Sequence, residues 1–209
     1  MKRRKILIAI LLIISILWVM HTLSKNFIID LDFKRFLSKK DTLPSNQILW
    51  GMMIRIHIIL AIIAMLSGPL GIIRRFRLNS PGFHRWNGRV YVVSIVLNFI
   101  PGLYVSFFAT GGWPSIIGFL ILNILWFTTT IFGYVYIKRK DFLRHSQWIT
   151  RSFFLAFANM IIYIIVAIAH NGLHISYSLS YTIAVWLCWI FNLAIAEFII
   201  RYKYLYTVK

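Results

Sequence analysis

The sequence predicts an all-α integral membrane protein, a six-transmembrane helix bundle with both termini in the cytoplasm. Of its 209 residues, 60% are hydrophobic and only 13% are charged, whereas a soluble domain has about 25% charged residues. The apolar residues form long uncharged runs, as in chains whose solvent is the bilayer. Lys and Arg gather at the ends of these runs, on one side of the predicted topology.

Six segments are long and apolar enough to cross the bilayer, which takes roughly 20 helical residues. The first follows four cations, as a signal peptide does, but bulky Trp18 and Met20 stand where cleavage requires small residues. We therefore predict a retained signal-anchor helix plus outer loop over residues 1–47, and a five-helix membrane domain over residues 48–209. The predicted spans are Ile6–Leu23, Ile48–Ile73, Val90–Thr110, Trp113–Ile137, Trp148–Ala169 and Tyr177–Ile200.

The distribution of cations predicts the orientation. Seventeen Lys and Arg residues lie at the N-terminus, in the second and fourth connections and in the C-terminal tail. Five lie on the opposite side, all between Lys25 and Lys40. The positive-inside rule places the more basic side, with both termini, in the cytoplasm. The net charge of +18 therefore indicates contact with an anionic leaflet of the lipid bilayer, and no nucleic-acid-binding motif accompanies it.

The loop from Lys25 to Gln47 is the one long connection. Phe27, Leu31 and Phe36 recur in it at near-helical spacing. The loop is therefore either an amphipathic helix on the outer membrane surface or an ordinary loop with scattered apolar residues.

An internal repeat over residues 80–137 and 141–200 is also predicted, with coincidence as the alternative. Each unit starts at a helix-capping residue, Ser80 or Asp141. A histidine follows four residues later, and an asparagine follows fourteen residues after the histidine. Fourteen residues return almost to the same helix face. These residues are His84 with Asn98 and His145 with Asn159.

Ionisable groups inside spans are costly and are candidates for functional sites. His57, in the outer half of the second span, can bind a metal or donate a hydrogen bond to another helix. His170, at the outer end of the fifth span, could approach it if the two spans are neighbours. His84 and His145 are predicted at the cytoplasmic mouth, among cations suited to anions or lipid headgroups. These cations are Arg85, Arg89, Arg144 and Arg151.

Other polar positions have structural alternatives. Arg55 can snorkel to the outer surface and anchor the second span. Glu197 lies one turn before Arg201, which predicts an ion pair between them. Gly68 and Pro69 predict a kinked or unwound inner end of the second span. The last four spans carry one amide each, either for interhelical hydrogen bonds or for lining a polar cavity. The amides are those of Asn98, Asn123, Asn159 and Asn192.

The segment from residue 83 to 91, FHRWNGRVY, resembles the His-Arg-Trp-x-Gly-Arg-x-Tyr signature of a bacterial membrane family, domain of unknown function 2306. Arg55-Ile56-His57 with Gly68-Pro69, the run 145–157 and the run 189–197 fit the same pattern. The resemblance extends from Arg55 to Arg201 and implies a bacterial cell membrane. Tyr163 departs from it, because the family is expected to have arginine near that position.

The layout of histidines is similar to that of the di-haem b-type transmembrane cytochromes. This similarity implies a membrane redox protein that passes electrons to a quinone or another redox partner. Its haem b would be bound through His57, His84, His145 and His170, with two haems in series and no other metal site. Two alternatives stay open, a transporter of small molecules or lipids and a non-enzymatic scaffold or accessory subunit.

Overall fold

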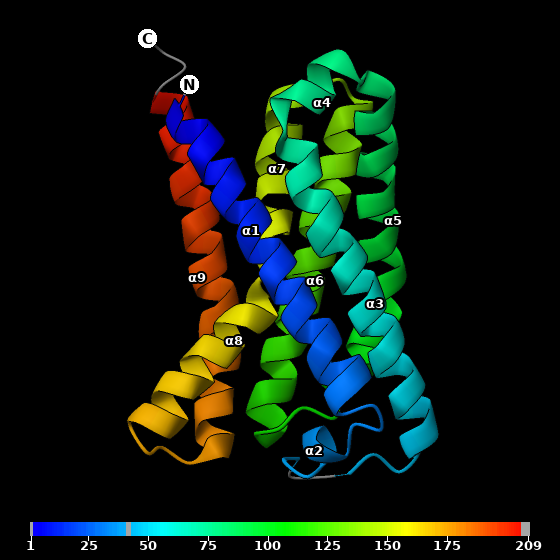
Figure 1. Cartoon of the computed structure of the whole chain (residues 1–209), viewed down its shortest axis with the longest axis vertical. Helices are drawn as coiled ribbons and strands as arrows, with labels where there is room; N and C mark the ends of the chain where they lie inside the picture. Colours follow the sequence, from blue (N-terminus) through cyan, green and yellow to red (C-terminus); the bar gives the residue numbers. More distant parts are fainter. Residues whose placement is uncertain (1, 41–42, 206–209) are drawn as a thin grey trace. The chain divides into compact units, whose positions relative to one another are not determined.

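The computed structural model describes the backbone of residues 2–40 and 43–205, and the side chains of residues 6–40, 43–73, 76 and 78–202. The described residues are helical for the most part and contain no strand. Within this described part of the chain, six helices are long and apolar enough to cross a membrane, which confirms the predicted fold class (Figure 1). The spans are Ile6–Ile29, Gln47–Ile72, Pro81–Ser106, Gly112–Lys138, Phe142–Gly172 and Tyr177–Tyr202.

Two spans start earlier than their apolar runs. The third starts at Pro81 instead of Val90, because proline is well suited to the first position of a helix. The fifth starts at Phe142 instead of Trp148, because the Asp141 carboxylate accepts the backbone N–H of Arg144 at 2.9 Å and caps the first turn. The side of the membrane on which each terminus lies stays a prediction.

The chain divides into two compact units. The first comprises residues 1–39 and 45–101, and the second comprises residues 40–44 and 102–209. The boundary at Pro101 falls inside helix α5 (Pro81–Ser106). The predicted division at residue 47 and the internal repeat stay predictions.

In the first unit, α1 (Lys2–Ser24) continues into the π-helical turn η1 (Lys25–Ile29), and α1 packs against α3 (Gln47–Ile72). Helix α3 runs without interruption through Pro69. The inner end is therefore not unwound, because the neighbouring turns keep their hydrogen bonds where proline removes a single donor. The short α4 (Arg74–Asn79) connects α3 to α5.

The loop between η1 and α3, which is predicted to lie on the outer side, folds around Phe33 instead of forming one amphipathic helix over its described residues. After η1, the described part of this loop (30–40 and 43–46) contains one regular segment, the single turn α2 (Lys34–Leu37). The Asp30 carboxylate accepts the backbone N–H groups of Arg35 and Phe36 at 3.0 and 2.9 Å. The ring of Phe33, buried to 1% exposure, meets the ring of Trp50 edge-on at 5.7 Å.

Arg55 holds this loop against α3. Its Nη2 donates to the carbonyl of Leu31 at 2.8 Å, and its guanidinium lies over the Phe33 ring at 5.3 Å. The anchoring role predicted for Arg55 therefore acts through the loop backbone and an aromatic face.

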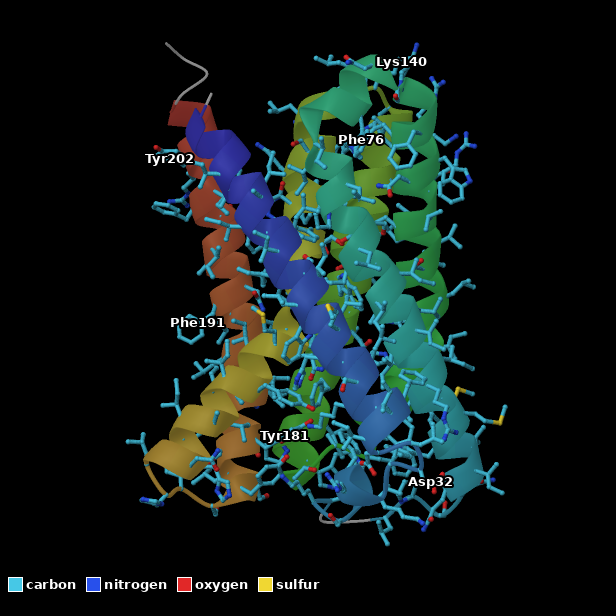
Figure 2. The ribbon with its side chains drawn as sticks, in the orientation of Figure 1. Asp32, Phe76, Lys140, Tyr181, Phe191 and Tyr202 are labelled. Carbon is cyan, nitrogen blue, oxygen red and sulfur yellow. The ribbon has the colours of Figure 1, made fainter. Side chains whose placement is uncertain are left out.

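The second unit contains α6 (Gly112–Lys138), α7 (Phe142–Leu155), α8 (Ala158–Val166), the π-helical segment η2 (Ala167–Gly172) and α9 (Tyr177–Leu205). Helix α6 packs against α7 and α9, and α8 packs against α9. On α9, the exposed side chains of Phe191 and Tyr202 point away from the neighbouring helices of this unit, as lipid-facing residues do (Figure 2).

Small and hydroxylated residues let these helices approach closely. The Thr130 and Ser152 hydroxyls, both fully buried, form a hydrogen bond of 2.6 Å between α6 and α7. The Ser115 and Thr182 hydroxyls join α6 to α9 at 2.9 Å. Such contacts are the usual source of specificity between helices in a membrane, where apolar contact alone does not distinguish helix neighbours from lipid.

Candidate functional site

A polar seam runs between α3 and α5 in the first unit. Near the α4 end, the Asn87 amide donates to the carbonyl of Ser67 at 2.8 Å. Further along, the imidazole of His57 lies beside the Asn98 side chain. From the first contact to the second, α3 is followed backwards by ten residues, from Ser67 to His57. Over the same length α5 is followed forwards by eleven residues, from Asn87 to Asn98. The two helices are therefore antiparallel neighbours over this length (Figure 1).

The His57–Asn98 layer holds polar atoms that lack hydrogen bonds. Asn98 is 1% exposed, and neither its Oδ1 nor its Nδ2 has a partner among the described residues. The Nδ1 atom of His57 is likewise buried without a partner. Buried polar groups in proteins are nearly always hydrogen-bonded, so three such atoms in one layer of a membrane span are unusual.

His145, near the start of α7, is oriented by the backbone. Its Nδ1 lies 2.8 Å from the carbonyl oxygen of Gly133 on α6. Since a carbonyl only accepts, Nδ1 donates its hydrogen, and Nε2 keeps a free lone pair in the neutral ring. Gly133 is well suited to this place because a Cβ there would lie 2.6 Å from Ile149 Cδ1.

His170, in η2, has the same arrangement at the other end of the fifth span. Its Nδ1 lies 2.8 Å from the carbonyl oxygen of Ile175, and its ring meets Tyr177 edge-on at 5.5 Å. His170 therefore also presents Nε2 as its free nitrogen. A metal-binding imidazole is typically held in this way, with its second nitrogen donating to a carbonyl or carboxylate.

His84 lies in the first turn of α5 and is half-buried. It is fourteen residues from Asn98, or roughly 21 Å along the helix axis. Since Asn98 lies beside His57, the first unit does not bring His57 and His84 together. In the second unit, His145 lies near the start of α7 and His170 lies in η2, at opposite ends of the fifth span.

The four predicted anion-contacting arginines differ in their surroundings. Arg85 and Arg89 are exposed on α5, and neither forms an ion pair among the described side chains. Arg144 pairs with Asp141 at 3.5 Å and lies over the Tyr136 ring. Arg151 pairs with Glu197, as described next. Arg85 and Arg89 are thus better placed than Arg144 and Arg151 to contact an external anion.

The predicted Glu197–Arg201 ion pair is wrong. The Nε of Arg151 donates to Glu197 Oε1 at 2.5 Å, and its guanidinium lies over the Trp148 ring at 4.6 Å. Arg201 is exposed on the last turns of α9. Glu197 therefore pairs with Arg151 on α7 and not with Arg201 on its own helix. The reason is that α7 packs against α9 and brings the less exposed Arg151 to the Glu197 carboxylate.

The four asparagines differ in their surroundings. Asn123 donates to Ser106 Oγ and to the carbonyl of Phe119, and Asn192 donates to the carbonyl of Cys188. Asn159 is exposed on α8. Asn98 is therefore distinct among the four, because it is buried and unpartnered.

Sequence reasoning identified His57 and Asn98 singly but missed their contact. It also missed the carbonyls of Gly133 and Ile175, since any residue supplies a backbone carbonyl and composition carries no signal for it. Among the described residues, no group of three or more His, Cys, Asp or Glu side chains is arranged to hold a metal ion. A haem iron takes at most two axial imidazoles, so the absence of a group of three or more does not test haem ligation.

A family model described as "Predicted membrane protein (DUF2306)" matches residues 54–200. This range covers most of the chain and includes all four predicted histidines. No curated protein matches the chain, and no solved structure matches it.

Proposed function

Because the chain belongs to the DUF2306 family of predicted membrane proteins, we propose from its own residues that it is a b-type haem protein of the membrane. Its axial ligands would be drawn from His57, His84, His145 and His170. Bound haem supplies one-electron transfer, so the proposed role is to pass electrons within the bilayer to a quinone or a protein redox partner.

The orientation of the imidazoles carries this proposal. His145 and His170 each direct Nδ1 to a backbone carbonyl at 2.8 Å, which leaves Nε2 as the ligating nitrogen. In His57 it is again Nδ1 that is buried, and the imidazole lies beside the Asn98 side chain. The Nδ1 atoms of His145 and His170 therefore donate to carbonyls, and the Asn98 side chain is available as a partner for His57. Hydrogen bonds that only joined helices would not need to use the same nitrogen each time.

The arginines support the same function. Haem carries two propionates, and Arg85 and Arg89 offer exposed guanidinium groups that form no ion pair among the described residues. A guanidinium group binds a carboxylate with two parallel hydrogen bonds. Arg85 follows His84 directly and Arg89 lies about one and a half turns further on, so one segment of α5 supplies an imidazole and two cations.

The alternative of a transporter has less support. It requires several polar side chains directed into a shared cavity, whereas the amides of Asn123 and Asn192 are satisfied within the second unit and Asn159 is exposed. The alternative of a scaffold predicts that the histidine substitutions change stability and nothing else.

The test is spectroscopic. The full chain is expressed with a haem supply and purified in detergent, and its reduced-minus-oxidised spectrum and haem content per polypeptide are measured. We expect a Soret band and an α band, and loss of haem when His57, His84, His145 or His170 is replaced by alanine. His21→Ala and His174→Ala are the controls, because both side chains are exposed. Absence of both bands, or haem content unchanged in all four variants, would overturn the proposal.

A further inference from the structure

Asn98 is a buried polar residue whose own hydrogen bonds the proposed function leaves unassigned. It is 1% exposed, it lies beside His57, and both of its amide atoms lack a partner among the described residues. Leaving three neighbouring polar atoms unsatisfied inside a membrane span is costly, and a helix bundle normally removes such a cost with a small side-chain movement.

The other buried intramembrane amides of this chain indicate which movement applies. Asn123 Nδ2 donates to the carbonyl four residues earlier, Phe119, at 3.1 Å. Asn192 Nδ2 does the same with Cys188 at 2.8 Å. The corresponding carbonyl for Asn98 belongs to Ser94, one turn earlier on α5. The terminal torsions of asparagine and histidine have broad, shallow minima, so turning these two groups costs little.

We propose that Asn98 is the positioning residue of His57. Its Nδ2 donates to the Ser94 carbonyl, and its Oδ1 accepts the Nδ1–H of His57. Turning these two groups thereby satisfies all three unpartnered atoms. It also fixes the neutral tautomer of His57 that carries hydrogen on Nδ1 and a lone pair on Nε2. This is the tautomer that the carbonyls of Gly133 and Ile175 impose on His145 and His170.

The effect of Asn98 on a bound iron rests on the proposed function, whereas the tautomer of His57 does not. A histidine whose Nδ1–H is held by an acceptor is a more basic ligand and stays in one orientation. An imidazole without such an acceptor changes tautomer and rotates, which weakens ligation. Asn98 thus gives α5 a role at His57 as well as at His84.

The first measurement uses nitrogen NMR of protein labelled with ¹⁵N-histidine, reconstituted in lipid bilayers without added haem. Protonated and unprotonated ring nitrogens resonate far apart, and His57→Gln identifies the His57 signals by their loss. We expect His57 to show a protonated Nδ1 and an unprotonated Nε2. In Asn98→Leu, which keeps a similar volume without hydrogen bonds, we expect most of the His57 signal to move to the Nε2–H tautomer.

Two further variants control for misfolding and for nonspecific effects. Asn98→Asp keeps an oxygen acceptor and should keep Nδ1 protonated. Asn159→Leu removes the exposed asparagine at the equivalent distance from His145 and should leave all six histidines unchanged. If Asn98→Leu does not yield monodisperse protein, the spectra of the wild type and of Asn98→Asp still show which ring nitrogen of His57 carries the hydrogen. An Nε2–H tautomer of His57 in the wild type, or an Nδ1–H retained in folded Asn98→Leu, would overturn the inference.

The second measurement uses the haem-loaded protein. Loss of the acceptor at Nδ1 makes His57 a weaker donor to iron, so Asn98→Leu should raise the midpoint potential of one haem relative to Asn159→Leu. If no haem is bound, the proposed function fails while the tautomer result stands. If haem is bound but the Asn98→Leu potential equals that of Asn159→Leu, the positioning role fails while the proposed function stands.

Discussion

Gly111, in the connection between α5 and α6, is the position where a single methyl group should be most disruptive in the second unit. Its φ of +93° is unfavourable for any residue with a Cβ. A Cβ there would lie 2.2 Å from Thr182 Oγ1 and 2.4 Å from Ser115 Oγ. These two hydroxyls are hydrogen-bonded to each other at 2.9 Å, so an alanine must separate them.

The magnitude follows from three contributions. The left-handed conformation costs about 1–2 kcal/mol, loss of the Ser115–Thr182 hydrogen bond costs about 1 kcal/mol, and overpacking costs about 1–3 kcal/mol. We expect Gly111→Ala to destabilise the protein by about 3–5 kcal/mol, allowing for partial relaxation. Gly112→Ala is the matched control, because Gly112 also has a positive φ, +65°, but has no atom near the added Cβ. It should cost only about 1–2 kcal/mol.

The assay is reversible unfolding in mixed micelles of increasing SDS content, followed by the fluorescence of the eight tryptophans. Replacing both Ser115 and Thr182 by alanine should lower the cost of Gly111→Ala by about 1–3 kcal/mol, since neighbouring sites couple by that order. Equal free energies of unfolding for Gly111→Ala and Gly112→Ala would refute the steric argument. Failure of the double alanine background to reduce the difference would also refute it.

Two further predictions concern ion pairs and loop structure. Arg151→Met should destabilise the protein by about 1–3 kcal/mol in the same assay, because it leaves the half-buried Glu197 carboxylate unpaired; Arg201→Met should be close to neutral, and the reverse order would contradict the observed pairing. Asp30→Ala should cost about 2–3 kcal/mol, because its buried carboxylate accepts two backbone N–H groups. Hydrogen exchange should then increase in residues 31–39, whereas Asp32→Ala, which removes an exposed carboxylate 3.6 Å from Lys34, should leave exchange and stability unchanged.

The six spans could be predicted because burial in hydrocarbon acts on composition over whole segments. A run such as Ile6–Leu23 has to become a helix, since no other single-segment structure satisfies its backbone in lipid. The Asp141 cap could also be predicted, because a capping side chain and the backbone N–H group that donates to it are close in sequence. Local chemistry and segment-averaged hydropathy therefore account for the part of the fold that sequence reasoning obtained.

Tertiary partners could not be predicted in the same way. Glu197 had a suitable arginine one turn away, yet it pairs with Arg151 on α7, because the choice depends on which helix faces α9. Phe33 gave no signal as a buried residue, since it lies in a polar loop and becomes buried only through its contacts with Trp50 and Arg55. Partners that are backbone carbonyls, such as that of Gly133 for His145, have no sequence signature at all.

The asparagines show how the structure separates function from packing where the sequence cannot. Four amides, one in each of the last four spans, were equivalent as residue types. In the structure, Asn123 and Asn192 complete hydrogen bonds of their own, so their loss should change stability. Asn98 is buried beside His57 with its hydrogen-bonding capacity unused. If the side chain at position 98 served only for packing, leucine would fill a similar volume there without leaving polar atoms unsatisfied. The seam between α3 and α5 is therefore the place in the first unit where a substitution should change a property of His57 before it changes the fold.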